Sequence, residues 1–114
     1  MLKLMMSAAM LTAMMCVAAQ AERICDVRSQ PLSDGDMITI KGRIVSSPSG
    51  RDDNGDYEYE IEDSCGLAVV TSRARIQCNG TVTISGSYDE EYSDYLEVFE
   101  EGDVALTATH VTCR

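Results

Sequence analysis

The sequence predicts a small all-β domain of five or six strands, and three observations support this prediction. Apolar and polar residues alternate with a period of two in several separate runs, as expected of strands with one buried face. Clusters of Gly, Pro, Asn and Asp, which favour turns, separate these runs. After the first 21 residues, no segment shows helical periodicity longer than one turn. The 114 residues suffice for one domain.

The N-terminal segment differs from the remainder of the chain. Lys3 precedes an apolar run over residues 4–19, and Ala19-Gln20-Ala21 offers small residues at the two positions that signal peptidase recognises. We therefore expect a signal peptide over residues 1–21, a domain over residues 22–114, and a periplasmic or secreted location. The alternative is an uncleaved membrane anchor, for which the run is at or below the roughly 17–25 residues that span a bilayer.

Cysteine usage agrees with export. The chain has five cysteines, and removal of the signal peptide takes away Cys16. Four remain: Cys25, Cys65, Cys78 and Cys113. An even number in a small exported domain indicates two disulfides. Because there is no C-x-x-C pair and His110 is the single histidine, we expect neither a zinc ribbon nor a cysteine nucleophile.

The predicted strands follow one another along the chain as residues 37–46, 57–63, 67–72, 81–88, 95–99 and 104–111. Residues 67–72 are apolar almost throughout, which suits a strand buried on both faces. The last two runs flank Glu101-Gly102-Asp103, and they form either one bent strand or two. The side chains that alternation directs inward are Ile38, Ile40, Ile44, Tyr57, Tyr59, Ile61, Val82, Ile84 and Tyr88.

Charge limits the classes of partner. The formal net charge is −10, and it becomes more negative when Lys3 leaves with the signal peptide. A field of this sign repels phosphate backbones and anionic lipid. We expect a monomer with no nucleic-acid partner and no membrane contact after signal cleavage, whereas a cation, a polyamine or a basic protein surface is compatible.

Four segments carry a resemblance to a known fold: residues 38–44 (ITIKGRI), 59–63 (YEIED), 67–70 (LAVV) and 82–86 (VTISG). Their spacing resembles that of an OB-fold, with a long first strand bent at a glycine, a hairpin, and a fourth strand of the form V-x-I-x-G. The chain is similar to the small exported bacterial OB-fold proteins, the BOF group. The resemblance implies an OB-like barrel of five to six strands, and a compact meander barrel or a small sandwich is the alternative.

The OB-fold resemblance also implies a disulfide pattern. In such a barrel the end of the second strand lies beside the N-terminal segment, and the fifth strand ends near the segment that leaves the third. This arrangement implies the pairs Cys25–Cys65 and Cys78–Cys113.

OB-folds bind ligands on strands two and three, between two flanking loops. Here both loops are acidic, and we expect them to meet at one rim of the barrel. Nucleic-acid-binding OB-folds carry basic and aromatic residues in these places, so the expected ligand is cationic. The candidate ligand-binding residues are Asp52, Asp53, Asn54, Asp56, Asp89, Glu90, Glu91, Tyr92, Asp94 and Tyr95.

One of these loops has a metal-like spacing. Asp52, Asn54 and Asp56 alternate as calcium ligands do, but an EF-hand requires Gly and Glu where Tyr57 and Asp63 stand. We expect no cofactor. A weaker calcium site is the alternative, and a solvated turn is the simpler interpretation.

Four aromatic residues surround the other loop: Tyr88, Tyr92, Tyr95 and Phe99. The phase of its strand places Tyr88 in the core, so Tyr92 and Tyr95 are the candidates for an exposed contact with a cationic partner.

The chain has neither G-x-S-x-G nor H-E-x-x-H. The sequence thus predicts a binding module and not an enzyme, with a protein-interaction module, such as an inhibitor or a stress accessory that covers a basic surface, as the alternative.

Overall fold

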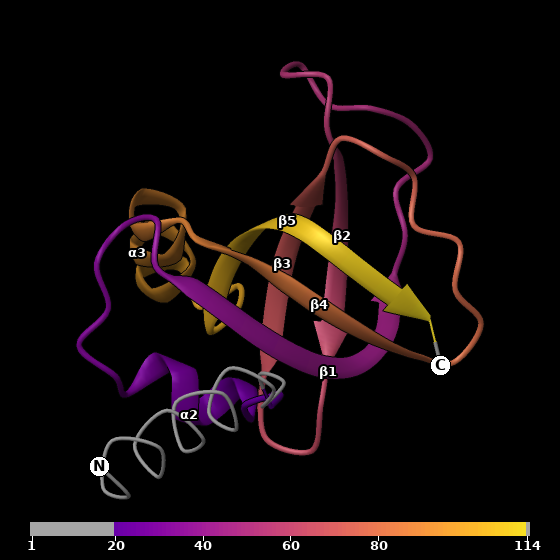
Figure 1. Cartoon of the computed structure of the whole chain (residues 1–114). Helices are drawn as coiled ribbons and strands as arrows, with labels where there is room; N and C mark the ends of the chain where they lie inside the picture. The colour runs from indigo at the N-terminus through magenta and orange to yellow at the C-terminus, as the bar shows by residue number, and fades with distance from the viewer. Residues whose placement is uncertain (1–19, 114) are drawn as a thin grey trace, which may run out of the picture.

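Five strands close into a single barrel in the computed structural model, which describes residues 20–113 (Figure 1). The strands pair in the order β1-β2-β3-β5-β4, and β4 returns to β1. Every pair is antiparallel except β3 with β5. The elements are β1 (Met37–Ser46), β2 (Tyr57–Glu62), β3 (Leu67–Ser72), β4 (Thr81–Tyr88) and β5 (Val104–Cys113). The predicted all-β, OB-like barrel is confirmed, whereas the predicted signal peptide lies outside the described residues except for positions 20 and 21.

The barrel interior contains the side chains that alternation predicts. Ile40, Ile61 and Ile84 are completely buried at the centre of the core. Ile44, Tyr57 and Tyr88 lie at its margins, where they are partly buried and pack against the central residues. The period of two therefore identified the inner face correctly in β1, β2 and β4.

A short helix, α2 (Ile24–Arg28), closes one end of the barrel. Ile24 and Val27 point into the core and are completely buried. The Cys25–Cys65 disulfide ties α2 to the turn between β2 and β3, and Figure 1 shows the helix beside this turn. The first pair implied by the OB-fold resemblance is thus present.

Residues 73–80, which join β3 to β4, close the other end. The backbone N–H of Ile76 donates to the Tyr59 hydroxyl at 2.7 Å inside the barrel. The Cys78–Cys113 disulfide fastens the same segment to the end of β5. Each disulfide therefore holds the segment that covers one end of the barrel.

The prediction for residues 89–99 is wrong, because they form a helix, α3 (Glu90–Phe99), in place of a loop and a strand. Asp89 is the N-cap: its carboxylate accepts the backbone N–H of Tyr92 at 3.0 Å. Acidic residues in the first turn interact favourably with the positive end of the helix dipole. The helix ends at Glu100, which has a left-handed backbone conformation with a φ of 55°. Neither the one-strand nor the two-strand alternative holds.

Within residues 20–113, neither helix is long and apolar enough to cross a bilayer.

Helix α3 packs on the outside of the barrel over β3 and β5. Leu96 is buried with Val69 of β3 and Ala105 of β5 in a small second core. The buried Ser93 hydroxyl accepts the backbone N–H of Ala105 at 2.8 Å. This contact explains why β3 is apolar on both faces: its inner face lines the barrel, and its outer face lies under α3.

Candidate binding surface on α3

Three aromatic side chains form a stripe along one flank of α3. Tyr92, Tyr95 and Phe99 are spaced at i, i+3 and i+7, which places them on neighbouring turns of one side. The ring centroids are 6.0 Å apart between Tyr92 and Tyr95, and 4.6 Å apart between Tyr95 and Phe99. Tyr95 is 47% exposed and Phe99 is 59% exposed. We call these three residues the aromatic stripe.

Tyr92 connects the aromatic stripe to the barrel. It packs against the second core, and its burial, followed by hydrogen bonding and charge from Glu58, raises the pKa of the Tyr92 phenol. The charge of Glu101 acts in the same direction. The phenol therefore stays protonated at neutral pH, and the stripe borders the Glu58 side chain of β2.

The surroundings of the stripe are acidic. Helix α3 has no lysine or arginine, and its carboxylates Glu91 and Asp94 are exposed. On the opposite flank, Glu97 and Asp103 are both within ion-pair distance of Arg28 from α2. The carboxylates on the α2 side thus have a cationic partner, whereas within residues 20–113 neither Glu91 nor Asp94 forms an ion pair.

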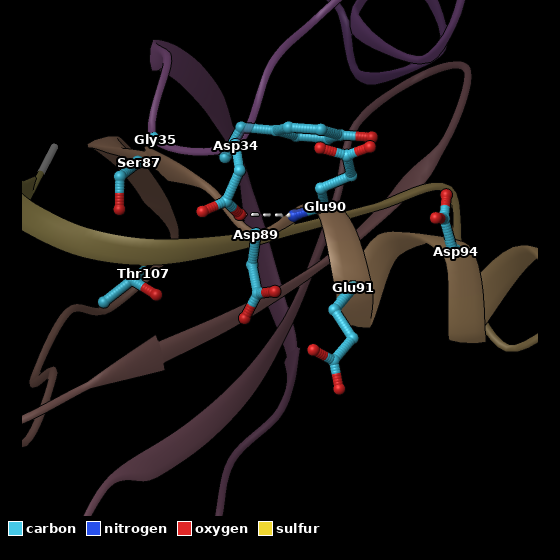
Figure 2. Close-up of a pocket in the computed structure, with 9 residues that line it drawn as sticks. Asp34, Gly35, Ser87, Asp89, Glu90, Glu91, Asp94 and Thr107 are labelled. Carbon is cyan, nitrogen blue, oxygen red and sulfur yellow. Dashed lines mark hydrogen bonds between the residues drawn. The ribbon is translucent and has the colours of Figure 1, made fainter.

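The N-terminal end of α3 borders a surface depression of ≈ 570 Å³ with several acidic side chains (Figure 2). Two of these carboxylates serve the helix itself: Asp89 caps it, and Asp34 accepts the backbone N–H of Glu90 at 3.0 Å. Figure 2 shows the carboxylates of Glu90, Glu91 and Asp94 spread along the depression, without a common point of convergence. The arrangement offers several separate negative charges and no cage for one metal ion.

The structure separates the two acidic loops that were expected to share a rim. Pairing of Tyr57 with Ser72 places residues 47–56 beyond the C-terminal end of β3. Pairing of Ala68 with Val104 places the junction of α3 and β5 at the N-terminal end of β3. Figure 1 shows the loop and α3 well apart. Asp89, Glu90, Glu91, Tyr92, Asp94 and Tyr95 therefore form one surface without the residues of the other loop.

The side chains of the 51–56 loop are engaged locally. The Asp52 carboxylate accepts the backbone N–H groups of Asn54 and Asp56 at 2.9 and 3.0 Å. Asp56 forms an ion pair with Arg73 at 3.1 Å, and Asp53 is exposed. Both N–H groups bond the same oxygen of the Asp52 carboxylate, so this side chain organises the turn. In the part of the chain that the structure describes, no three His, Cys, Asp or Glu side chains are grouped to hold a metal.

Sequence reasoning missed Asp34 and Glu58 as neighbours of the surface. Both come from segments distant in sequence, so only the tertiary fold brings them to α3. The helical spacing of Tyr92, Tyr95 and Phe99 was a local signal that could have placed the stripe on one flank. The short apolar run over residues 95–99 gave a competing indication of a strand.

Comparison with known proteins supports the fold alone. No protein-family model matches the chain, and no curated protein matches it. Among solved structures, the chain is similar to an aspartyl tRNA synthetase from Entamoeba histolytica, with a TM-score of 0.59 and 12% sequence identity. The match covers 81% of this chain and 20% of the synthetase, so the chain spans about a fifth of that protein. The likeness agrees with an OB-like barrel and assigns no activity.

Proposed function

We propose that the chain is an exported, non-catalytic binding module whose α3 surface binds a basic segment of a partner protein. The observation that carries this proposal is the exposed pair of tilted rings, Tyr95 and Phe99, on a helix rich in carboxylates. Aromatic residues are enriched at protein interfaces. An aromatic face beside carboxylates suits lysine or arginine, which gains cation–π contact and charge pairing together.

Several features support an interface with a protein in preference to a single-ion site. The rings of Tyr95 and Phe99 are exposed, so the surface offers apolar area as well as charge. The carboxylates around α3 are spread over about three helical turns, which matches the spacing of charges on a peptide. The two disulfides agree with an oxidising compartment outside the cytoplasm.

The proposal is tested with a lysine- and arginine-containing peptide and the oxidised protein, by isothermal titration calorimetry. Replacement of both exposed rings, Tyr95→Ala with Phe99→Ala, should weaken binding by about tenfold or more because each ring contributes area and cation–π contact. Val98→Ala is the matched control, since it removes an exposed side chain from the same helix outside the stripe. An equal loss of affinity in the two variants, or an affinity that does not change with salt concentration, would contradict the proposal.

A polyamine is a second candidate ligand, favoured by the depression beside Asp34, Glu90 and Asp94. Spermine carries several ammonium groups along a flexible chain, and the carboxylates there are similarly spread (Figure 2). Binding of spermine should raise the melting temperature by mass action. Glu90→Gln with Asp94→Asn should abolish this shift, and the Tyr95→Ala, Phe99→Ala variant should keep it.

A further inference from the structure

Two guanidinium groups lie against one tyrosine at the start of β2. Arg51 comes from the loop after β1, and Arg75 comes from the segment after β3. Their Cζ atoms lie 5.3 and 4.8 Å from the centroid of the Tyr57 ring. Tyr57 begins β2 and packs against the core, so the ring is fixed while both arginines are exposed.

Among residues 47–56, no carboxylate forms an ion pair with either of these arginines. Asp52 uses its carboxylate on two backbone N–H groups of its own loop, and Asp56 pairs with Arg73. Within residues 20–113, no carboxylate lies at ion-pair distance from Arg51 or Arg75. Two like charges near one ring repel each other, and an anion bound by both arginines would relieve this repulsion.

We propose that Arg51, Tyr57 and Arg75 form a binding site for a phosphate group. Guanidinium N–H groups are arranged to bond two oxygens of one phosphate, which a spherical halide cannot offer. The Tyr57 hydroxyl supplies a further donor on a fixed ring. Hydrogen bonding from Arg51, opposed by burial and reinforced by the charges of Arg51 and Arg75, lowers the pKa of Tyr57, as expected of a locally positive environment.

This site differs from the proposed α3 surface in position and in sign. The protein as a whole is strongly negative, so a long polyanion would be repelled by the carboxylates of β2 and α3. A single phosphate group contacts only the positive area. The inference is independent of the proposed function, because no residue is shared.

Phosphate titration followed by backbone amide NMR tests the site. The oxidised protein is titrated with inorganic phosphate, and sodium chloride keeps the ionic strength constant. Saturable shifts are expected at Arg51, Tyr57 and Arg75, with a dissociation constant of about 1 mM for an exposed site of this kind. Glycerol 3-phosphate in a parallel titration distinguishes a phosphate ester from the free anion by its tighter binding.

Two arginine variants, one as the test and one as the control, examine the role of the guanidinium groups. Arg51→Ala with Arg75→Ala should weaken phosphate binding by about tenfold or more. Arg43→Ala removes one positive charge from an exposed arginine that pairs with Glu62, and it should leave binding unchanged. All three side chains are exposed, so amide spectra of folded variants are expected. Shifts that chloride reproduces, an equal loss in Arg43→Ala, or tighter binding of an oligonucleotide than of phosphate would overturn the assignment.

Discussion

The Asp63 carboxylate, directly after β2, accepts the backbone N–H of Ile24 at 2.7 Å and thereby fixes the first residue of α2 to the β2–β3 turn. Its other oxygen accepts the N–H groups of Cys65 and Gly66, both at 2.9 Å. One side chain thus organises the turn and holds the helix that closes this end of the barrel.

The Asp63 contacts predict a loss of stability in acid. Partial burial opposes ionisation, but the three backbone N–H groups and Arg23 lower the pKa of Asp63 below its ordinary value. Because the folded pKa is the lower one, the stabilisation is complete above the ordinary value of about 4 and is lost as pH falls through the folded value. Asp63→Ala should reduce the free energy of unfolding at neutral pH by about 1–3 kcal/mol.

Urea unfolding measured between about pH 7 and about pH 2.5 checks this prediction. Asp63→Ala should also flatten the acid side of the stability profile, since the titrating group is gone. Asp53→Ala is the control because that side chain is exposed. An acid side unchanged in Asp63→Ala would assign the effect to other carboxylates.

Removal of either disulfide should destabilise the barrel, with local effects at different ends. Cys25 and Cys65 are separated by 40 positions, and Cys78 and Cys113 by 35. Replacement of either pair by serine should lower the free energy of unfolding by about 2–4 kcal/mol. Hydrogen exchange should accelerate first around Ile24 in one variant and around Ile76 in the other. Uniform acceleration in both variants would contradict the assignment of one end to each disulfide.

A side chain at Gly42 should destabilise the folded protein. A Cβ at this position of β1 would lie 2.5 Å from the backbone oxygen of Glu62, because β1 bends closely over β2 there. Gly42→Ala should lower the free energy of unfolding by about 1–3 kcal/mol. Gly50→Ala, with no atom within 4 Å of the added Cβ, should change it little. Calorimetric melting of the two variants makes the comparison.

Attachment of α3 should depend on the Ser93 hydroxyl. Ser93→Ala leaves the buried N–H of Ala105 without this acceptor, which should cost about 1–3 kcal/mol. Thr109→Ala also removes a hydroxyl, one that donates to Ser85 near the surface, and should cost less. Hydrogen exchange of the α3 amides would reveal the difference. Equal protection in both variants would mean that packing of Leu96 alone holds the helix.

Much of the barrel was predictable because period-two burial is a local pattern. Ile38 and Ile40 alternate with polar neighbours, so the inner face of β1 follows from the sequence alone. The apolar character of β3 correctly indicated burial on both faces, although it did not reveal that α3 provides the outer cover. The disulfide pairs followed from the topology of the OB-fold, which fixes which strand ends are neighbours.

The candidate surface was less predictable, since its geometry depends on one helix that was taken for a strand. Residues 95–99 are apolar except for Glu97, as in a short strand, while Asp89 and the acidic first turn mark a helix start. The helical signals prevailed because Leu96 and Ser93 reach the barrel only in a helix. The expectation that both acidic loops meet failed for a non-local reason, the length of β3 between them.

The parallel pairing of β3 with β5 has a consequence for the order of folding. β5 is the last strand described, and it bridges β3 to β4. The Arg28 guanidinium, near the start of the domain, donates a hydrogen bond to Asp103, which lies 75 positions later in the chain. A growing chain therefore has open sheet edges until residues 104–113 emerge. Closure of the barrel therefore has to wait for β5, which supplies the missing neighbour of both β3 and β4.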